Sequence, residues 1–110
     1  MKNFIVVLNL IFLATGGWAA TASDETVDLR YENRRWIPQT ITMPANRPFK
    51  IKIVNASQEA IEFESFKLNR EKVAGPGETV IVAIPALRPG SYDFYDDFHA
   101  DVPQGTIVTK

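Results

Sequence analysis

Apolar and polar residues alternate along most of this chain, and this alternation limits its fold more than any other feature. A period of two places one set of side chains on a buried face of a strand and the other set on the opposite face. Pro, Gly and Asn residues separate the alternating runs about every ten residues. We therefore predict an all-β fold, a Greek-key β-sandwich of about seven strands. The apolar positions of the runs are Val27, Leu29, Tyr31, Phe49, Ile51, Ile53, Ile61, Phe63, Val80, Val82, Ile84, Tyr92 and Phe94, with a last run at residues 106–109.

One segment, residues 67–73, does not follow this pattern. Its sequence Lys-Leu-Asn-Arg-Glu-Lys-Val fits an irregular crossover between strands or a single helical turn. No long helical pattern occurs elsewhere in the sequence, so a mixed α+β fold is the weaker alternative.

Residues 1–22 have the organisation of a secretory signal peptide. Lys2 supplies a positive charge, residues 4–14 are apolar apart from one Asn, and small residues lead up to a cleavage point after Ala19 or Ala22. The apolar run is shorter than the ~20 residues that span a bilayer. No cysteine follows it, which excludes a lipoprotein anchor. We expect a periplasmic domain at residues 23–110, with no stable membrane insertion after cleavage.

The composition narrows the possible functions of this domain. The chain contains no cysteine, so its fold must rest on apolar packing and strand pairing even though export would permit disulfides. The formal net charge is −1 and no basic stripe is present, which makes nucleic acid an improbable partner.

The chain's only histidine lies in an acidic stretch between two strand-like runs. His99 is preceded by Asp93, Asp96 and Asp97 and followed by Asp101. An imidazole among carboxylates in a loop is typical of a metal site, and the lack of cysteine rules out thiolate ligation. We expect Asp93 and Asp101 to be solvated charges.

A second acidic pair lies upstream. Glu62 and Glu64 fall on the same face of a predicted strand, ~7 Å apart along it. A metal ion would relieve their repulsion; alternatively, Lys67 or Arg70 would act as the counter-ion. Because Phe94 should point inward, Asp96 two residues later should share its face, and a buried carboxylate needs a partner.

Several short motifs, taken in order, resemble the cupredoxin family. They lie at residues 38–45, 48–55, 62–65, 76–77 and 87–94, and are followed by His99 and by Gly-Thr-Ile at 105–107. The resemblance implies a cupredoxin-like sandwich in which Asp96 stands at the position of the copper-binding cysteine and His99 at that of the histidine that follows. Glu62 and Glu64 lie in the region of the upstream histidine. Such a ligand set suits Cu(II), Fe(II) or Fe(III) and disfavours Cu(I).

A narrower resemblance concerns residues 61–77. This stretch is similar to the cupredoxin domains of bacterial iron-uptake systems, including the EfeO family, although Trp36 stands where that family has a cysteine. The resemblance implies periplasmic handling of iron, with copper as a second candidate. It also implies a periplasmic iron-binding protein and an inner-membrane iron permease as partners.

The sequence thus predicts a metal-binding protein that assists iron, or iron and copper, acquisition. The predicted metal ligands are Glu62, Glu64, Asp96, Asp97 and His99. The chain has no Ser-His-Asp order, no phosphate loop and no second histidine, which argues against an enzyme. Two alternatives stay open: a metal-free interaction subunit of a transport complex, and an accessory component of ferrous-iron oxidation.

Overall fold

The computed structural model of the protein describes residues 25–110, which form nine strands and no helix. The predicted signal peptide lies outside these described residues. Between residues 25 and 110 no helix has the length and hydropathy that crossing a bilayer requires. The strands are β1 (Glu25–Tyr31), β2 (Trp36–Ile37), β3 (Thr40–Met43), β4 (Phe49–Asn55), β5 (Ile61–Ser65), β6 (Arg70–Ala74), β7 (Thr79–Ile84), β8 (Gly90–Asp96) and β9 (Gly105–Thr109).

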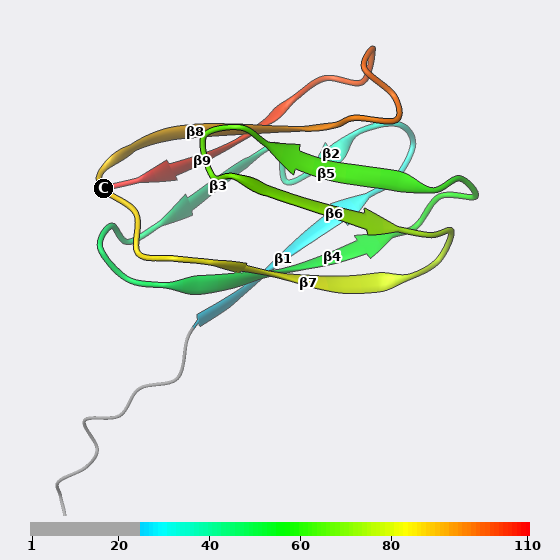
Figure 1. Cartoon of the computed structure of the whole chain (residues 1–110). Coiled ribbons are helices and arrows are strands. Elements are labelled where there is room, and N and C mark those ends of the chain that lie inside the picture. The colour runs from blue at the N-terminus through cyan, green and yellow to red at the C-terminus, as the bar shows by residue number, and fades with distance from the viewer. Residues whose placement is uncertain (1–24) are drawn as a thin grey trace, which may run out of the picture.

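The strands form two sheets that pack face to face as a sandwich (Figure 1). One sheet has the order β2-β1-β4-β7 and the other the order β3-β9-β8-β5-β6. Two pairings, β1 with β4 and β3 with β9, are parallel, and all the others are antiparallel. The sequence prediction of an all-β sandwich is therefore confirmed.

The core lies between the sheets and is built from the inward members of the alternating runs. In β4 and β5 buried residues alternate with more exposed ones, as a period of two requires. Four aromatic rings pack edge-on or stacked at one end of this core, with centroid separations between 5.0 and 6.0 Å. They belong to Tyr31, Trp36, Phe63 and Phe94.

The prediction for residues 67–73 was wrong. A turn at residues 66–69 leads into β6, which pairs with β5 at the edge of the five-stranded sheet. The strand has a mostly exposed burial pattern, so it lacks the apolar alternation by which the other strands are recognised. The alternating runs named from the sequence are six, and the observed strands that none of them covers are β2, β3 and β6.

Four loops gather at one end of the sandwich, on the right in Figure 1: β1–β2, β4–β5, β6–β7 and β8–β9. Asn55, fully buried at the end of β4, joins two of them. Its side-chain amide donates to the carbonyls of Glu59, Ala74 and Gly75 at 2.8–3.0 Å, and its oxygen accepts from Ser57. This end, called the rim below, carries the candidate site.

Candidate functional site

Three carboxylates meet on the outer face of the five-stranded sheet, at the rim. One oxygen from each of Glu62, Glu64 and Asp97 lies within 4.8 Å of the others. The two glutamates point outward because the alternate positions of β5 are buried. Asp97, just beyond β8, is held beside them by its backbone N–H, which donates to the Glu62 carbonyl at 2.9 Å. We call these three residues the carboxylate cluster.

The surroundings of the cluster oppose negative charge. The pKa of Glu62 is raised to about 7. The largest cause is partial burial, followed by the neighbouring Glu71 carboxyl and then by the charges of Glu64 and Asp97. The pKa of Glu64 is raised as well, mainly by burial and then by Asp97 and Glu71. Tyr95, opposite Glu64 on β8, has a raised pKa because of burial and the same acidic neighbours. A cation at this point would neutralise charges that now repel one another.

No basic side chain among residues 25–110 forms an ion pair with the cluster. Lys67 donates instead to the carbonyl of Ser91, and the Nε of Arg70 donates to the carbonyl of Ala83. The alternative in which Lys67 or Arg70 neutralises the glutamates is therefore wrong.

The raised pKa of Glu62 predicts an unusual dependence of stability on pH. The folded protein binds the Glu62 proton more tightly than the unfolded chain does, so the free energy of unfolding should fall as pH rises from about 4.5 to about 7. Glu62→Gln should reduce this fall and be more stable than the wild type at pH 8 by roughly 1 kcal/mol, since screening limits the gain. Urea unfolding of the wild type and of Glu62→Gln at pH 4.5 and at pH 8 measures the difference in their free energies of unfolding. A variant that gains equally at both pH values would contradict the assigned repulsion.

Asp96 and His99 form a separate group inside the rim. The Asp96 side chain is fully buried, as its alternation with Phe94 predicted. Its Oδ1 accepts the backbone N–H groups of Glu62 and Phe98, both at 3.0 Å. Its Oδ2 lies 2.7 Å from the Nδ1 of His99. The buried carboxylate is thus satisfied by protein donors alone.

The second nitrogen of the His99 ring is also engaged. Its Nε2 lies 2.8 Å from an Oε1 of Glu59, an exposed residue of the β4–β5 loop. Both ring nitrogens of His99 therefore lie within hydrogen-bond distance of a carboxylate oxygen. These contacts join β8, the β8–β9 loop and the β4–β5 loop.

Tyr31 lies beneath this group. Its hydroxyl is buried and has no hydrogen-bond partner of good geometry among residues 25–110. Burial, and next the adjacent Asp96 carboxylate, raise the pKa of Tyr31 to about 12, so the phenol stays protonated at physiological pH.

The five predicted ligands therefore fall into two groups. Glu62, Glu64 and Asp97 converge on the outer face, whereas Asp96 and His99 contact each other inside the rim. That all five bind one ion stays a prediction. Sequence reasoning did not single out Glu59, because a loop glutamate four residues after Asn55 carries no pattern that marks it.

A blue-copper centre does not fit these residues. The chain has no cysteine to supply the thiolate that defines such a centre. Asp96, the residue at the cysteine position, already uses both oxygens for backbone N–H groups and for His99.

Comparison with known proteins identifies the family. The sequence matches the cupredoxin-like domain family over residues 4–109. It is 30% identical over 117 residues to RP394, an uncharacterized protein of Rickettsia prowazekii (strain Madrid E), covering 99% of this chain and 94% of that protein. The chain belongs to the cupredoxin-like domain family.

Solved structures support the same fold. The metal-binding domain of the Cu(I)-exporting P-type ATPase CopA of Streptococcus pneumoniae, with Cu(I), has a TM-score of 0.69 at 14% identity, covering 77% of this chain and 84% of that one. Auracyanin A, a blue copper protein of Chloroflexus aurantiacus, has a TM-score of 0.68 at 16% identity, covering 80% and 100%. At such identities the likeness extends to the fold and not to the ligands.

Proposed function

We propose that this protein is a periplasmic metal-binding member of the cupredoxin-like family that binds a hard cation at the carboxylate cluster. The observation that carries the proposal is the convergence of three carboxylate oxygens within 4.8 Å, with no basic partner among the described residues. Carboxylate oxygens suit Fe(II), Fe(III) or Cu(II) better than the softer Cu(I).

In this proposal Glu62, Glu64 and Asp97 are the direct ligands, and Asp96 and His99 hold the rim in place. Asp96 accepts the backbone N–H groups of Glu62, a member of the cluster, and of Phe98, which follows the cluster residue Asp97 in the sequence. His99 then holds Asp96 on one side and Glu59 on the other. Supporting residues of this kind set the positions of ligands without touching the ion.

The test is a titration of the metal-free protein with Cu(II), and with Fe(II) without oxygen, followed by calorimetry. We expect one saturable site. A double variant, Glu62→Gln with Glu64→Gln, should weaken binding at least about tenfold, which corresponds to about 1.4 kcal/mol. Asp28→Asn, which removes one exposed charge from β1 on the other sheet, serves as the control. Unchanged binding by the double variant would refute the cluster as the site.

Electron paramagnetic resonance of the Cu(II) form tests the role of His99. Ligation by carboxylates alone should give no coupling to nitrogen. Nitrogen coupling that disappears in His99→Gln would show instead that the imidazole turns toward the metal and binds it, as the sequence predicted for all five residues.

We further propose that the bound metal is iron on its way into the cell, received from a periplasmic iron-binding protein and delivered to an inner-membrane permease. The support is the hard ligand set together with the sequence resemblance to iron-uptake cupredoxin domains. Cells that lack the protein should take up less iron under iron limitation. The wild-type gene should restore uptake, and the Glu62→Gln, Glu64→Gln gene should not.

One observation favours a second candidate, a metal-free interaction subunit of a transport complex. The loops of the rim are joined to one another by the contacts of His99 with Asp96 and Glu59, which are protein groups alone. A ligand that binds only the native state must raise the unfolding temperature. If saturating Cu(II) and Fe(II) both leave that temperature unchanged, the interaction subunit becomes the preferred function.

A further inference from the structure

Charged residues are divided unequally between the two ends of the sandwich. The end opposite the rim is formed by the loops at residues 44–48, 66–69 and 85–89 and by Lys110, which follows β9 (Figure 1). We call these residues the base. No acidic residue occurs among them, and their basic residues are Arg47, Lys67, Arg88 and Lys110. The rim loops instead combine arginines with acidic residues, which are Glu32, Glu59, Glu78, Asp97 and Asp101.

Hydrogen bonds hold the loops of the base next to one another. The β3–β4 loop donates from Asn46 to a carbonyl of the β7–β8 loop at 2.7 Å, and from Ala45 to the Lys110 carbonyl at 3.3 Å. The Nζ of Lys67, in the β5–β6 turn, donates to the carbonyl of Ser91 at the start of β8 at 3.0 Å. The basic residues of the base therefore lie on one connected surface.

Most of the positive charge at the base has no internal counter-ion. Among residues 25–110, Lys67, Arg88 and Lys110 form no ion pair, and only Arg47 lies near a carboxylate, 3.6 Å from Glu25. Clustered charges of one sign attract a partner of the opposite sign.

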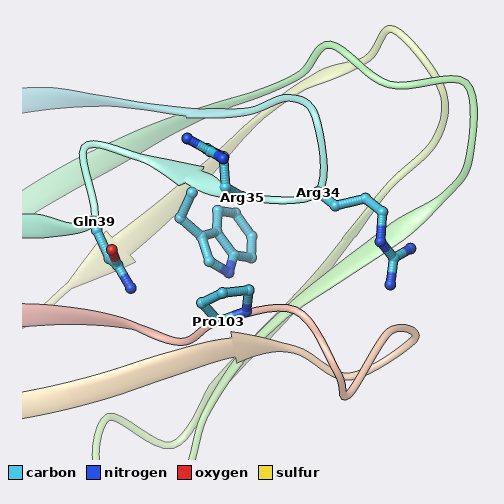
Figure 2. A pocket seen from close by; sticks show the side chains of 5 residues that line it. Arg34, Arg35, Gln39 and Pro103 are labelled. Atoms are coloured by element: carbon cyan, nitrogen blue, oxygen red, sulfur yellow. The ribbon is translucent and has the colours of Figure 1, made fainter.

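The arginines of the rim do not form a comparable surface. Arg34 and Arg35 line a pocket there, but Figure 2 shows their side chains extending away from each other. Arg34 is also paired with Asp101 at 2.6 Å. Positive charge at the rim is thus divided and partly neutralised by the protein itself.

An aromatic side chain projects from the base. Phe66, in the β5–β6 turn, is 82% exposed, whereas no other large apolar residue among 25–110 is more than 50% exposed. The turn is anchored by Leu68, which is buried and whose N–H donates to the Ser65 hydroxyl at 3.3 Å. Basic residues beside an exposed aromatic ring are the combination with which amphipathic segments bind the surface of anionic membranes.

The chain also enters the domain at the base. Strand β1 begins there at Glu25, and residues 1–24 precede it (Figure 1). Their sequence contains the apolar run at residues 4–14, which we expect to enter the membrane during export. While that run is attached, the base is the end of the domain from which the chain leads to the bilayer.

We propose that the base docks this domain reversibly on the surface of an anionic lipid bilayer. Lys67, Arg88 and Lys110 would lie against the lipid phosphates, and the Phe66 ring would lie among the headgroups. The charges need not meet at one point, because each basic residue near a charged membrane adds its own attraction. The proposal does not depend on metal binding, since the base and the carboxylate cluster share no residue.

Co-sedimentation with lipid vesicles tests the proposal. The protein used is the domain of residues 23–110, which contains every described strand and lacks the apolar run that would itself bind lipid. Cooperative thermal unfolding verifies that it is folded. It is mixed, in metal-free buffer, with vesicles of phosphatidylcholine or of phosphatidylcholine with phosphatidylglycerol. We expect binding only to the anionic vesicles, and its loss at high salt, which screens the charges.

Matched pairs of substitutions locate the surface by charge. Lys67→Gln with Arg88→Gln should weaken binding to the anionic vesicles roughly 25-fold, about fivefold for each basic residue. Arg30→Gln with Arg34→Gln removes the same charge near the rim, from exposed pairs with Glu32 and Asp101, and should bind almost like the wild type.

Tryptophan fluorescence identifies the end that meets the lipid. With anionic vesicles, the emission of Phe66→Trp should move to shorter wavelength and be quenched by brominated lipid. Phe98→Trp, at an exposed aromatic position of the rim, serves as the control and should show neither effect. The wild type supplies the emission of the buried Trp36 as the baseline.

Three outcomes would overturn the proposal. The first is no binding to the anionic vesicles, which would leave an acidic protein as the partner of the base. The second is an equal loss of affinity in the two double variants, which would mean that the lipid responds only to net charge. The third is an emission shift in Phe98→Trp without one in Phe66→Trp, which would place the rim on the membrane.

Discussion

Asp96→Ala should lower the free energy of unfolding by at least about 3 kcal/mol, because each buried donor that loses its acceptor costs about 1–3 kcal/mol. The substitution leaves the backbone N–H groups of Glu62 and Phe98 and one nitrogen of His99 without their acceptor. For a domain of this size the unfolding temperature should fall by at least about 12 °C. Thermal unfolding followed by circular dichroism measures this change.

Asp93→Ala is the matched control, because Asp93 lies on the same strand but is exposed and its carboxylate contacts only Thr106. Its effect should stay within about 0.5 kcal/mol. Asp96→Asn keeps the shape and an oxygen for the two backbone donors, so it should cost less than the alanine variant. Equal effects of Asp96→Ala and Asp93→Ala would show that the buried carboxylate does not hold the rim together.

Gly105→Ala should destabilise the fold by about 2–3 kcal/mol, toward the upper end of the range for an overfilled core. Gly105 on β9 pairs with Phe94 on β8, and the Phe94 ring lies directly over it. A methyl group at residue 105 would overlap the ring well inside any distance that real side chains show. Either the ring or the strand must then move.

Gly90→Ala provides the comparison on the neighbouring strand. A methyl group there would meet the Tyr92 ring at 3.7 Å, an ordinary contact. Adding Phe94→Leu to Gly105→Ala should make the combined cost smaller than the sum of the two single costs, because the smaller side chain frees the space. Strictly additive costs would refute the contact as the cause.

The fold was predictable wherever burial imposed a period of two. Strands β4, β5 and β8 follow that period, and the inward direction of Asp96 came from its spacing from Phe94. Strand β6 escaped prediction because an edge strand has little buried surface to mark it. Trp36 lies outside the alternating runs named from the sequence, yet it is 2% exposed and packs against three other rings.

The candidate site was predictable in composition but not in geometry. The outward glutamates and the acidic loop could be read from the strand pattern. Asp96 points into the core, whereas Asp97, the next residue, lies on the outer face. The alternation of faces along a strand predicts this difference between adjacent residues. The contact of His99 with Glu59 could not be predicted from the sequence, because it depends on how the β8–β9 and β4–β5 loops approach each other at the rim.

Strand β9 is the last strand in the sequence and yet lies between β3 and β8. Until residues 105–109 leave the ribosome, β3 has no neighbour in its sheet and β8 has one open side. A nascent chain therefore exposes unpaired strand edges, which invite association with other chains. Any chaperone that protects these edges must act until residues 105–109 are available for pairing, because β9 completes the five-stranded sheet.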